Sequence, residues 1–260
     1  DTEIDFLTDY LVKQPSVRSV YLINQDYAYG HAVQSTSRKL LKQKRPDIKI
    51  AGETFIPLGK IKDFAPYAAK IRGSGADTVV TGNWGNDLYL LVRAGHEAGL
   101  AVRYYILVGN VAGSTTGIGS AGVGKVWSLF PWHANADPNP YVDFNETYRE
   151  KYQSKANYDY LPAHRAIAML AQAFDKAQSD DPLEVALALE GMKFDGPEGQ
   201  SWVRPEDHQL VTPLYLAALS EAGQPGVRID AEDTGLGWKT VIKAEGESFV
   251  PPVKCKVKRP

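Results

Sequence analysis

The chain has 260 residues, which is enough for one large domain or two modest ones, each with a hydrophobic core. Hydrophobic residues make up 43% of the sequence and charged residues 23%, as is ordinary for a folded globular protein. The formal net charge of -2 gives no reason to expect nucleic acid or acidic membrane as a partner. The sequence also contains no run of about 18 apolar residues that could span a membrane.

Cysteine content and the start of the sequence bear on the compartment. Cys255 is the single cysteine, so neither an intrachain disulfide nor a cysteine zinc cluster can form. One thiol in a chain of this length is compatible with an oxidising compartment. The sequence begins Asp-Thr-Glu, without a Met or an apolar leader. We therefore expect that a leader has been removed or that this is part of a longer chain.

The first half of the chain alternates short apolar runs with amphipathic segments. The pattern predicts strands over 19–24, 47–57, 77–81, 104–109 and 125–130, and helices over 29–43, 63–75 and 87–100. Asp63 is expected to cap the second of these helices, which Gly73 or Gly75 ends. Gly99 ends the third. This alternation predicts right-handed crossovers and a parallel sheet covered by helices.

After Pro131 the character of the sequence changes. Residues 131–140 are rich in Pro and Asn and are typical of a connector. The pattern that follows predicts helices over 141–155, 161–178 and 181–192 and short strands over 201–205 and 212–220. Asp181 is expected to cap the last helix, with Pro182 at its first position. Long amphipathic helices with few strands leave an apolar face exposed, so this half looks like the completion of a domain whose earlier strands lie outside this sequence.

Two glycine-rich stretches resemble nucleotide-binding motifs but lack the required context. Gly117–Gly122 fits G-x-G-x-x-G, yet the strand before it ends near Gly109 and the segment after it looks extended, so we expect a loop. Gly119–Val126 nearly spells a P-loop, but Val126 stands where a Ser or Thr must hold magnesium. The five histidines have no metal-ligand spacing, and no G-x-S-x-G is present. The sequence thus indicates no catalytic residue, no cofactor site and no metal site.

The residues that indicate binding follow the predicted strands. In open parallel sheets, ligands bind outside the carboxyl ends of the strands. Segments 24–32, 82–87 and 108–114 lie at that edge, and the side chains they bring there are Tyr27, Tyr29, Asn83, Trp84, Asn86, Asp87 and Asn110. Aromatic walls with a few amide and hydroxyl groups suit a small, partly apolar ligand. Two alternatives stay open: one Tyr is a core residue, and Asp87 caps the next helix.

With these residues the sequence resembles the periplasmic solute-binding proteins of ABC transporters, in the branched-chain amino acid (leucine-binding-protein-like) group. The matching stretches are INQDYAYGHAVQ (23–34), the long segment 57–100 and the segment 188–217. The resemblance implies the type I periplasmic-binding fold. In this α/β fold, two lobes, each a parallel sheet flanked by helices, are joined by three crossovers and close on ligand by a hinge.

The resemblance also implies domain boundaries, with the first lobe incomplete. We expect a lead-in helix from the first lobe or hinge over 1–15 and a complete second lobe over 16–131. A hinge crossover over 132–140 would then lead to the C-terminal part of the first lobe, with the last hinge crossing, over 141–260. The family's N-terminal third, with the groups that grip the ligand carboxylate, is absent from this sequence.

The resemblance maps the family's ligand residues onto two positions of the same residue type and onto a third position where the residue differs. The second-lobe tyrosine of the YG motif falls on Tyr29, and the second aromatic wall falls on Trp84. Amino-acid-binding members carry a Glu after the next strand that pairs with the ligand ammonium, where this sequence has Asn110. A neutral amide cannot balance a buried ammonium. A carboxylate without an amine is therefore a candidate beside an α-amino acid, and Asp87 is an alternative charge partner.

The function that the resemblance implies is capture of a solute in the periplasm. We expect a non-enzymatic, cofactor-free monomer that binds a small amino acid or a related aromatic carboxylate between its lobes and delivers it to an inner-membrane permease. A removed signal peptide is expected, and a lipid anchor stays open. Two alternatives remain: a ligand-sensing regulatory receptor on the same fold, and an enzyme that uses the same cleft.

Overall fold

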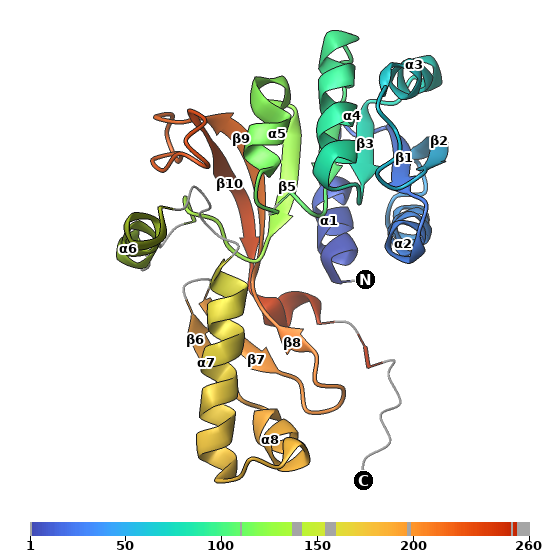
Figure 1. The fold of residues 1–260 in the computed structure, drawn as a ribbon. Helices are drawn as coiled ribbons and strands as arrows, with labels where there is room; N and C mark the ends of the chain where they lie inside the picture. The colour runs from blue at the N-terminus through green and yellow to red at the C-terminus, as the bar shows by residue number, and fades with distance from the viewer. Residues whose placement is uncertain are drawn as a thin grey trace.

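The computed structural model describes residues 2–109, 111–136, 142–153, 160–196, 199–250 and 252–253. Asn110, Cys255 and the end of the predicted connector lie outside the described residues. The chain forms a larger α/β unit and a smaller unit below it, as oriented in Figure 1. Among the described residues, no helix combines the length and the apolar composition needed to cross a membrane.

The larger unit is built on one seven-stranded sheet. Its strands are β1 (Ser19–Gln25), β2 (Lys49–Ile56), β3 (Thr78–Thr81), β4 (Arg103–Ile106), β5 (Val126–Phe130), β9 (Leu214–Glu221) and β10 (Leu236–Ala244). The order across the sheet is β10-β9-β5-β4-β3-β1-β2. Strands β1 to β5 pair in parallel, β9 pairs antiparallel with β5, and β10 pairs antiparallel with β9. The predicted strand–helix alternation of the first half is confirmed.

Helices cover both faces of this sheet. The helices are α1 (Thr2–Val12), α2 (Ala28–Lys44), α3 (Ala65–Ser74), α4 (Gly85–Glu97) and the short α5 (Ser114–Ile118), followed by a 3-10 turn, η1 (Gly119–Gly122). Within β1, Val20 and Leu22 pack with α1 and α2, whereas Tyr21 and Ile23 pack with α3 and α4. Successive strand residues point to opposite faces, which explains why β1 had to be apolar throughout.

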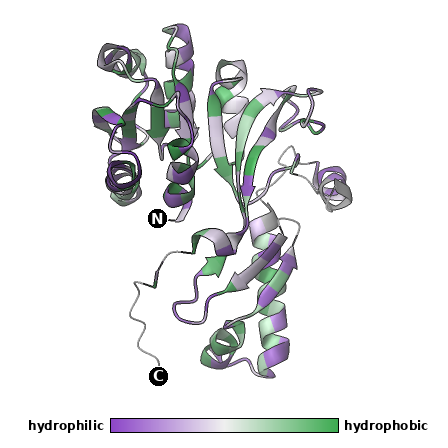
Figure 2. Ribbon diagram, turned by 180° about the vertical axis from the view of Figure 1, so that it is seen from behind, coloured by the Kyte–Doolittle hydropathy of each residue, from purple (hydrophilic) through white to green (hydrophobic). Residues whose placement is uncertain are grey.

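The smaller unit contains α6 (Val142–Tyr152), α7 (Tyr160–Ala177), α8 (Pro182–Leu189) and a three-stranded antiparallel sheet of β6 (Lys193–Gly196), β7 (Gly199–Val203) and β8 (Leu210–Val211). Met169 of α7 packs with Phe194 and Val203 of that sheet. Other apolar side chains of α7 and α8 are exposed: Ile167, Leu170, Phe174, Leu183 and Leu187. Figure 2 shows hydrophobic residues along both helices. The expected exposed apolar face is present.

The sheet is larger than the predicted second lobe. Residues 16–131 supply β1 to β5, but β9 and β10 come from the segment 141–260, which we assigned to the first lobe and the last crossing. The physical reason is that β5 would otherwise be an edge strand, and β9 pairs with it from Trp127 to Phe130. The described chain returns to the larger unit at the step from β8 to β9.

Helix ends follow the sequence signals with two corrections. Asp181 caps α8 as predicted, accepting hydrogen bonds from the backbone N–H groups of residues 183 and 184. The N-cap of α3 is Phe64 rather than Asp63, although the Asp63 carboxylate accepts a hydrogen bond from the Ala65 N–H at 2.8 Å. Gly75 ends α3 in the left-handed conformation. Gly117–Gly122, expected to be a loop, forms the end of α5 and the turn η1.

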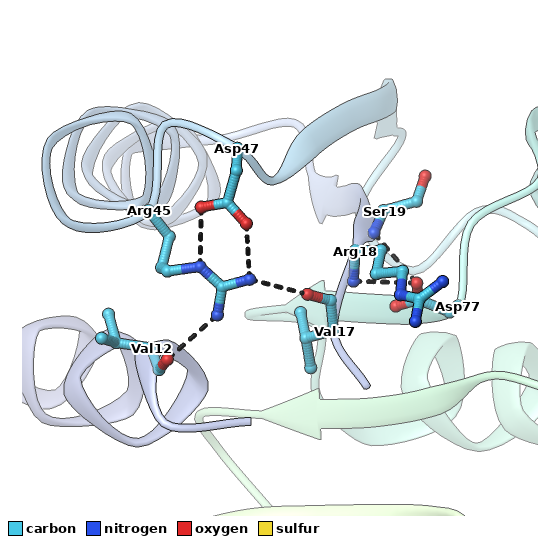
Figure 3. A network of polar contacts seen from close by, with 7 residues as sticks. All are labelled: Val12, Val17, Arg18, Ser19, Arg45, Asp47 and Asp77. Atoms are coloured by element: carbon cyan, nitrogen blue, oxygen red, sulfur yellow. Dashed lines mark hydrogen bonds and ion pairs between the residues drawn. The ribbon is translucent and has the colours of Figure 1, made fainter. Parts of the chain in front are cut away.

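A polar network holds α1 and α2 to the amino-terminal end of the sheet (Figure 3). The Arg45 guanidinium at the end of α2 donates to the carbonyls of Val12 and Val17, at 3.0 and 3.3 Å, and to both oxygens of Asp47. The Asp77 carboxylate accepts from the two amides that open β1, at 2.9 and 3.0 Å. These bonds satisfy backbone N–H and C=O groups at the edge of the sheet opposite the carboxyl ends of the strands.

Candidate ligand-binding site

The first part of the site is the turn from β1 into α2. Tyr27 is the N-cap residue of α2 and has an extended backbone, with φ of -160°. The chain turns so tightly here that a Cβ on Gly30 would lie 1.9 Å from the carbonyl oxygen of Gln25. Glycine is therefore required directly after Tyr29. This close approach gives the YG motif its physical reason and fixes both tyrosines at the carboxyl end of β1.

The second part is the turn from β3 into α4. Trp84 is the extended N-cap residue of α4, and its side chain remains 39% exposed. Because β1 and β3 are neighbours in the sheet, the two N-cap side chains meet, and the Trp84 indole Nε1 donates to the Tyr27 hydroxyl at 2.9 Å. The Tyr27 and Tyr29 rings lie 6.1 Å apart between centroids. The structure thus brings Tyr27, Tyr29 and Trp84 together as one aromatic rim.

Tyr29 is half-buried and lies over Gly82, where an added Cβ would come within 3.1 Å of its ring. Its burial raises the pKa of the Tyr29 phenol, and the nearby charges of Glu3 and Tyr27 raise it further. The hydroxyl is therefore a neutral group that can both donate and accept at physiological pH. Among the described residues it has no hydrogen-bond partner, so it is available to a ligand.

Asn83 and Asp87 lie below the rim rather than on it. They are 0% and 1% exposed. The Asp87 Oδ2 atom accepts from the Gln25 Nε2 atom and from the Gly59 backbone N–H, each at 2.8 Å. These bonds lead to the end of β1 and to the loop after β2, not to the amides of α4. The structure therefore differs from the alternative in which Asp87 caps its own helix.

Several polar atoms beneath the rim have no partner in the described part of the chain. They are Gln25 Oε1, Asp87 Oδ1 and both side-chain amide atoms of Asn83. An unsatisfied buried polar group costs about 1–3 kcal/mol, so such groups are rare in stable cores and gather where water or ligand completes them. This orphaned polar layer lies directly behind an aromatic rim, which supports a binding site at this edge.

Sequence reasoning missed the support beneath the rim. Gln25 also donates to the Trp84 carbonyl at 3.3 Å, and so links the two turns. Asn24 accepts from the Gly82 N–H at 2.7 Å and donates to Gln34 at 3.2 Å. Two consecutive amides at the end of an otherwise apolar strand were the available signal, because buried amides need fixed partners. The exposed Asn86, in contrast, makes no hydrogen bond to the rim residues within the described part of the chain.

The third predicted segment, 108–114, is held near its start by a hydrogen bond and leads into α5 at its end. Asn110 itself lies outside the described residues. The Gly109 N–H donates to Ser128 Oγ at 3.0 Å, and Gly113 precedes α5 with φ of +84°. Within the described chain, no group of three or more His, Cys, Asp and Glu is arranged to hold a metal ion.

The charges around the rim favour an anionic group on a ligand. The amino ends of α2 and α4 both point to this edge and carry partial positive charge. Asp26 pairs with His31 at 2.7 Å, and Asp87 is buried beneath the surface. The Asp26 carboxylate contacts His31 although more than half of its side chain is exposed, and the Asp87 carboxylate is not on the rim. The arrangement can therefore stack a planar or branched apolar group and accept a carboxylate nearby.

Comparisons with known proteins address the family and the fold of the chain. The family model described as "Periplasmic binding protein" matches residues 1–224. The Leu/Ile/Val-binding protein homolog 4 of Brucella melitensis is 29% identical over 246 residues, covering 92% of this chain and 58% of the relative. This chain therefore spans a little over half the length of that relative.

Solved structures agree in fold. The closed conformation of the leucine-, isoleucine-, valine-, threonine- and alanine-binding protein of Brucella ovis superposes with a TM-score of 0.85 at 27% identity, over 100% of this chain and 65% of that one. A solute-binding protein of an ABC transporter from Rhodopseudomonas palustris, solved with p-hydroxybenzoic acid, superposes with a TM-score of 0.79 at 20% identity. That match covers 94% of this chain and 65% of the other.

Proposed function

Since the chain belongs to the periplasmic binding protein family, we propose that it is the substrate-binding component of an ABC transporter. It captures a small solute between two lobes and presents it to an inner-membrane permease. The observation that carries the proposal is the aromatic rim of Tyr27, Tyr29 and Trp84 over buried amide and carboxylate atoms that have no partner in the described chain. A ligand that binds the closed state better than the open state then drives closure.

The ligand that we propose is a small amino acid or a related aromatic carboxylate. The rim supplies indole and phenol faces for an apolar group, and Tyr29 supplies a free hydroxyl. The amino ends of α2 and α4 favour a carboxylate at the same edge. The Brucella ovis protein is named for aliphatic amino acids and threonine, and the Rhodopseudomonas palustris protein was solved with p-hydroxybenzoic acid. Both classes belong in a test.

The remaining features of the proposal follow from the family. The protein works in the periplasm, delivers its solute chemically unchanged, uses no cofactor and acts as a monomer. A removed leader fits that location. Asn83, Asp87 and Asn110 are proposed as ligand-site residues together with the rim. Asn83 and Asp87 act from below, because their side chains are almost fully buried.

We also propose that the exposed face of α7 and α8 is where the first lobe is completed. Ile167 is 68% exposed, and Phe174 lies two turns further along the same side of α7. The spacing makes a continuous apolar stripe, which a sheet would cover. We therefore expect residues 1–260 alone to melt broadly and to bind a hydrophobic dye. A single cooperative transition without dye binding would contradict this division.

The solute class is tested by thermal denaturation of the complete two-lobed protein with leucine, threonine and p-hydroxybenzoic acid, each added separately. A compound present at 100 times its Kd should raise the melting temperature by about 5 °C or more. Stabilisation by an amino acid would mean that another acid, Asp87 being the candidate, replaces the missing Glu as the partner of the ammonium. Stabilisation by the aromatic acid alone would assign a ligand without an amine. If none of the three compounds, nor any other amino acid or benzoate, shifts the transition, the proposed function is wrong.

A further inference from the structure

The turn between β9 and β10 contains two adjacent residues in an unfavourable backbone conformation. Glu232 and Asp233 have φ of +62° and +55°, in the left-handed region that residues with a Cβ rarely adopt. The turn is held in this shape by Asp230, whose two carboxylate oxygens accept from the N–H groups of Thr234 and Gly235, at 2.9 and 2.7 Å. Strained residues that a surrounding network fixes in place are often found where a side chain has a specific task.

The Glu232 side chain reaches from this turn to the start of α5. One carboxylate oxygen accepts from the Gly113 N–H at 2.8 Å, and the other accepts from the N–H and the hydroxyl of Thr116, both at 2.7 Å. The residue is 6% exposed. A carboxylate that accepts three hydrogen bonds out of water holds its donors firmly, since each such bond is charge-assisted. Glu232 lies 119 residues along the chain from Gly113, so the contact joins the start of α5 to a distant part of the chain. The start of α5 is also held by the Trp238 indole Nε1, which donates to the Thr115 hydroxyl at 3.0 Å, and by the Ser114 N–H, which donates to the Val111 carbonyl at 3.0 Å.

The contact lies at the C-terminal end of segment 108–114, the third of the segments predicted at the carboxyl ends of the strands. At the near end, the Gly109 N–H is held by Ser128 of β5. Between these two points the chain runs from the carboxyl end of β4 to α5, and it includes the predicted ligand residue Asn110. Gly113 has φ of +84°, a conformation that glycine adopts without strain. Glu232 adds a charge-assisted contact from outside the segment.

We propose that Glu232 is a positioning residue of the candidate site: it fixes Gly113 and the start of α5, so that solute affinity depends on a side chain that does not touch the solute. This inference rests on the proposed function, and it adds the β9–β10 turn to the parts that determine it. The neighbouring Asp233 provides a matched control. It has the same strained backbone, but its carboxylate pairs with Arg149 of α6, at 2.5 Å, and is about half exposed.

The test compares Glu232→Gln with Asp233→Asn in the complete two-lobed protein, using hydrogen exchange and binding together. Glu232→Gln is isosteric, but it turns an N–H₂ group towards backbone N–H donors and so breaks at least one bond. We expect amide exchange in 107–117 to speed up by about tenfold or more, because a charge-assisted bond is lost there. Exchange in β1 and β3 should stay as in the parent chain. Affinity for whichever of leucine, threonine or p-hydroxybenzoic acid most stabilises the parent should fall by a similar factor.

Variants of the donor supply a rescue. Thr116→Val removes one hydroxyl bond to Glu232 and should weaken affinity, whereas Thr116→Ser keeps that hydroxyl and should restore it. Asp233→Asn should leave both exchange in 107–117 and affinity unchanged. Unchanged exchange in Glu232→Gln would overturn the proposal, and so would faster exchange with unchanged affinity. If no compound stabilises the parent chain, the proposed function fails, and the exchange data still decide whether Glu232 fixes the segment.

Discussion

Replacing Trp84 by Ala separates a binding role from a structural one. The indole is 39% exposed, and its one recorded hydrogen bond goes to the Tyr27 hydroxyl at the surface. If a solute covers the exposed part, it removes roughly 100 Å² of a side chain whose full surface is about 250 Å², which corresponds to about 2.5 kcal/mol. We therefore expect solute affinity to fall by about 70-fold. The cost to the free energy of unfolding should stay near 1 kcal/mol, as for the loss of one exposed hydrogen bond.

The assay is calorimetric titration of Trp84→Ala and Trp84→Phe with the stabilising compound, alongside chemical denaturation without it. Trp84→Phe keeps an aromatic face and loses only the indole N–H, so it should retain most of the affinity. A loss of stability in unliganded Trp84→Ala as large as that of a core truncation, about 3–5 kcal/mol, would refute the reasoning. So would an affinity unchanged within a factor of two.

Three further predictions concern stability. Burial lowers the pKa of His133 to about 3, from 6.5. Because only the unfolded state then takes up the proton, the free energy of unfolding should fall by about 1.4 kcal/mol per pH unit as pH drops from 6.5 towards 3. His133→Gln should flatten this slope in denaturation curves measured at several pH values, and an unaltered slope would assign it elsewhere. Gly30→Ala places a Cβ 1.9 Å from a backbone oxygen and should cost about 3 kcal/mol, measured by urea denaturation; a near-neutral result would show that the turn can relax. Asp181→Ala removes both capping bonds of α8 and should cost about 1 kcal/mol in the same assay, whereas Asp181→Asn should cost less.

The sequence predicts best those buried elements whose apolar residues follow a regular local pattern. β1 is apolar over its whole length, and α4 alternates with helical period between Trp84 and Gly99, so each pattern determines its element. β10 was not predicted, because "LGWKTVIKA" has one exposed face and pairs only with β9. The place of β10 in the sheet depends on contacts between residues distant in sequence. For the same reason, the lobe predicted to end at residue 131 did not include β9 and β10.

The site could be predicted in part for the same reason. The rule that ligands bind at the carboxyl ends of parallel strands predicts that Tyr27, Tyr29 and Trp84 lie together at that edge of the sheet. That rule says nothing about depth, so it placed Asn83 and Asp87 on the rim although both are buried. Glu232 could not be found from sequence, because its contact joins positions more than a hundred residues apart.

The central claim is that this chain captures a small carboxylate solute and releases it unchanged. Equilibrium dialysis with the stabilising compound, followed by denaturation and mass spectrometry of what was bound, tests this most directly. The account predicts one equivalent per chain, recovered with its original mass, and about 70-fold weaker retention by Trp84→Ala. Recovery of a chemically altered compound, or equal retention by Trp84→Ala, would contradict it.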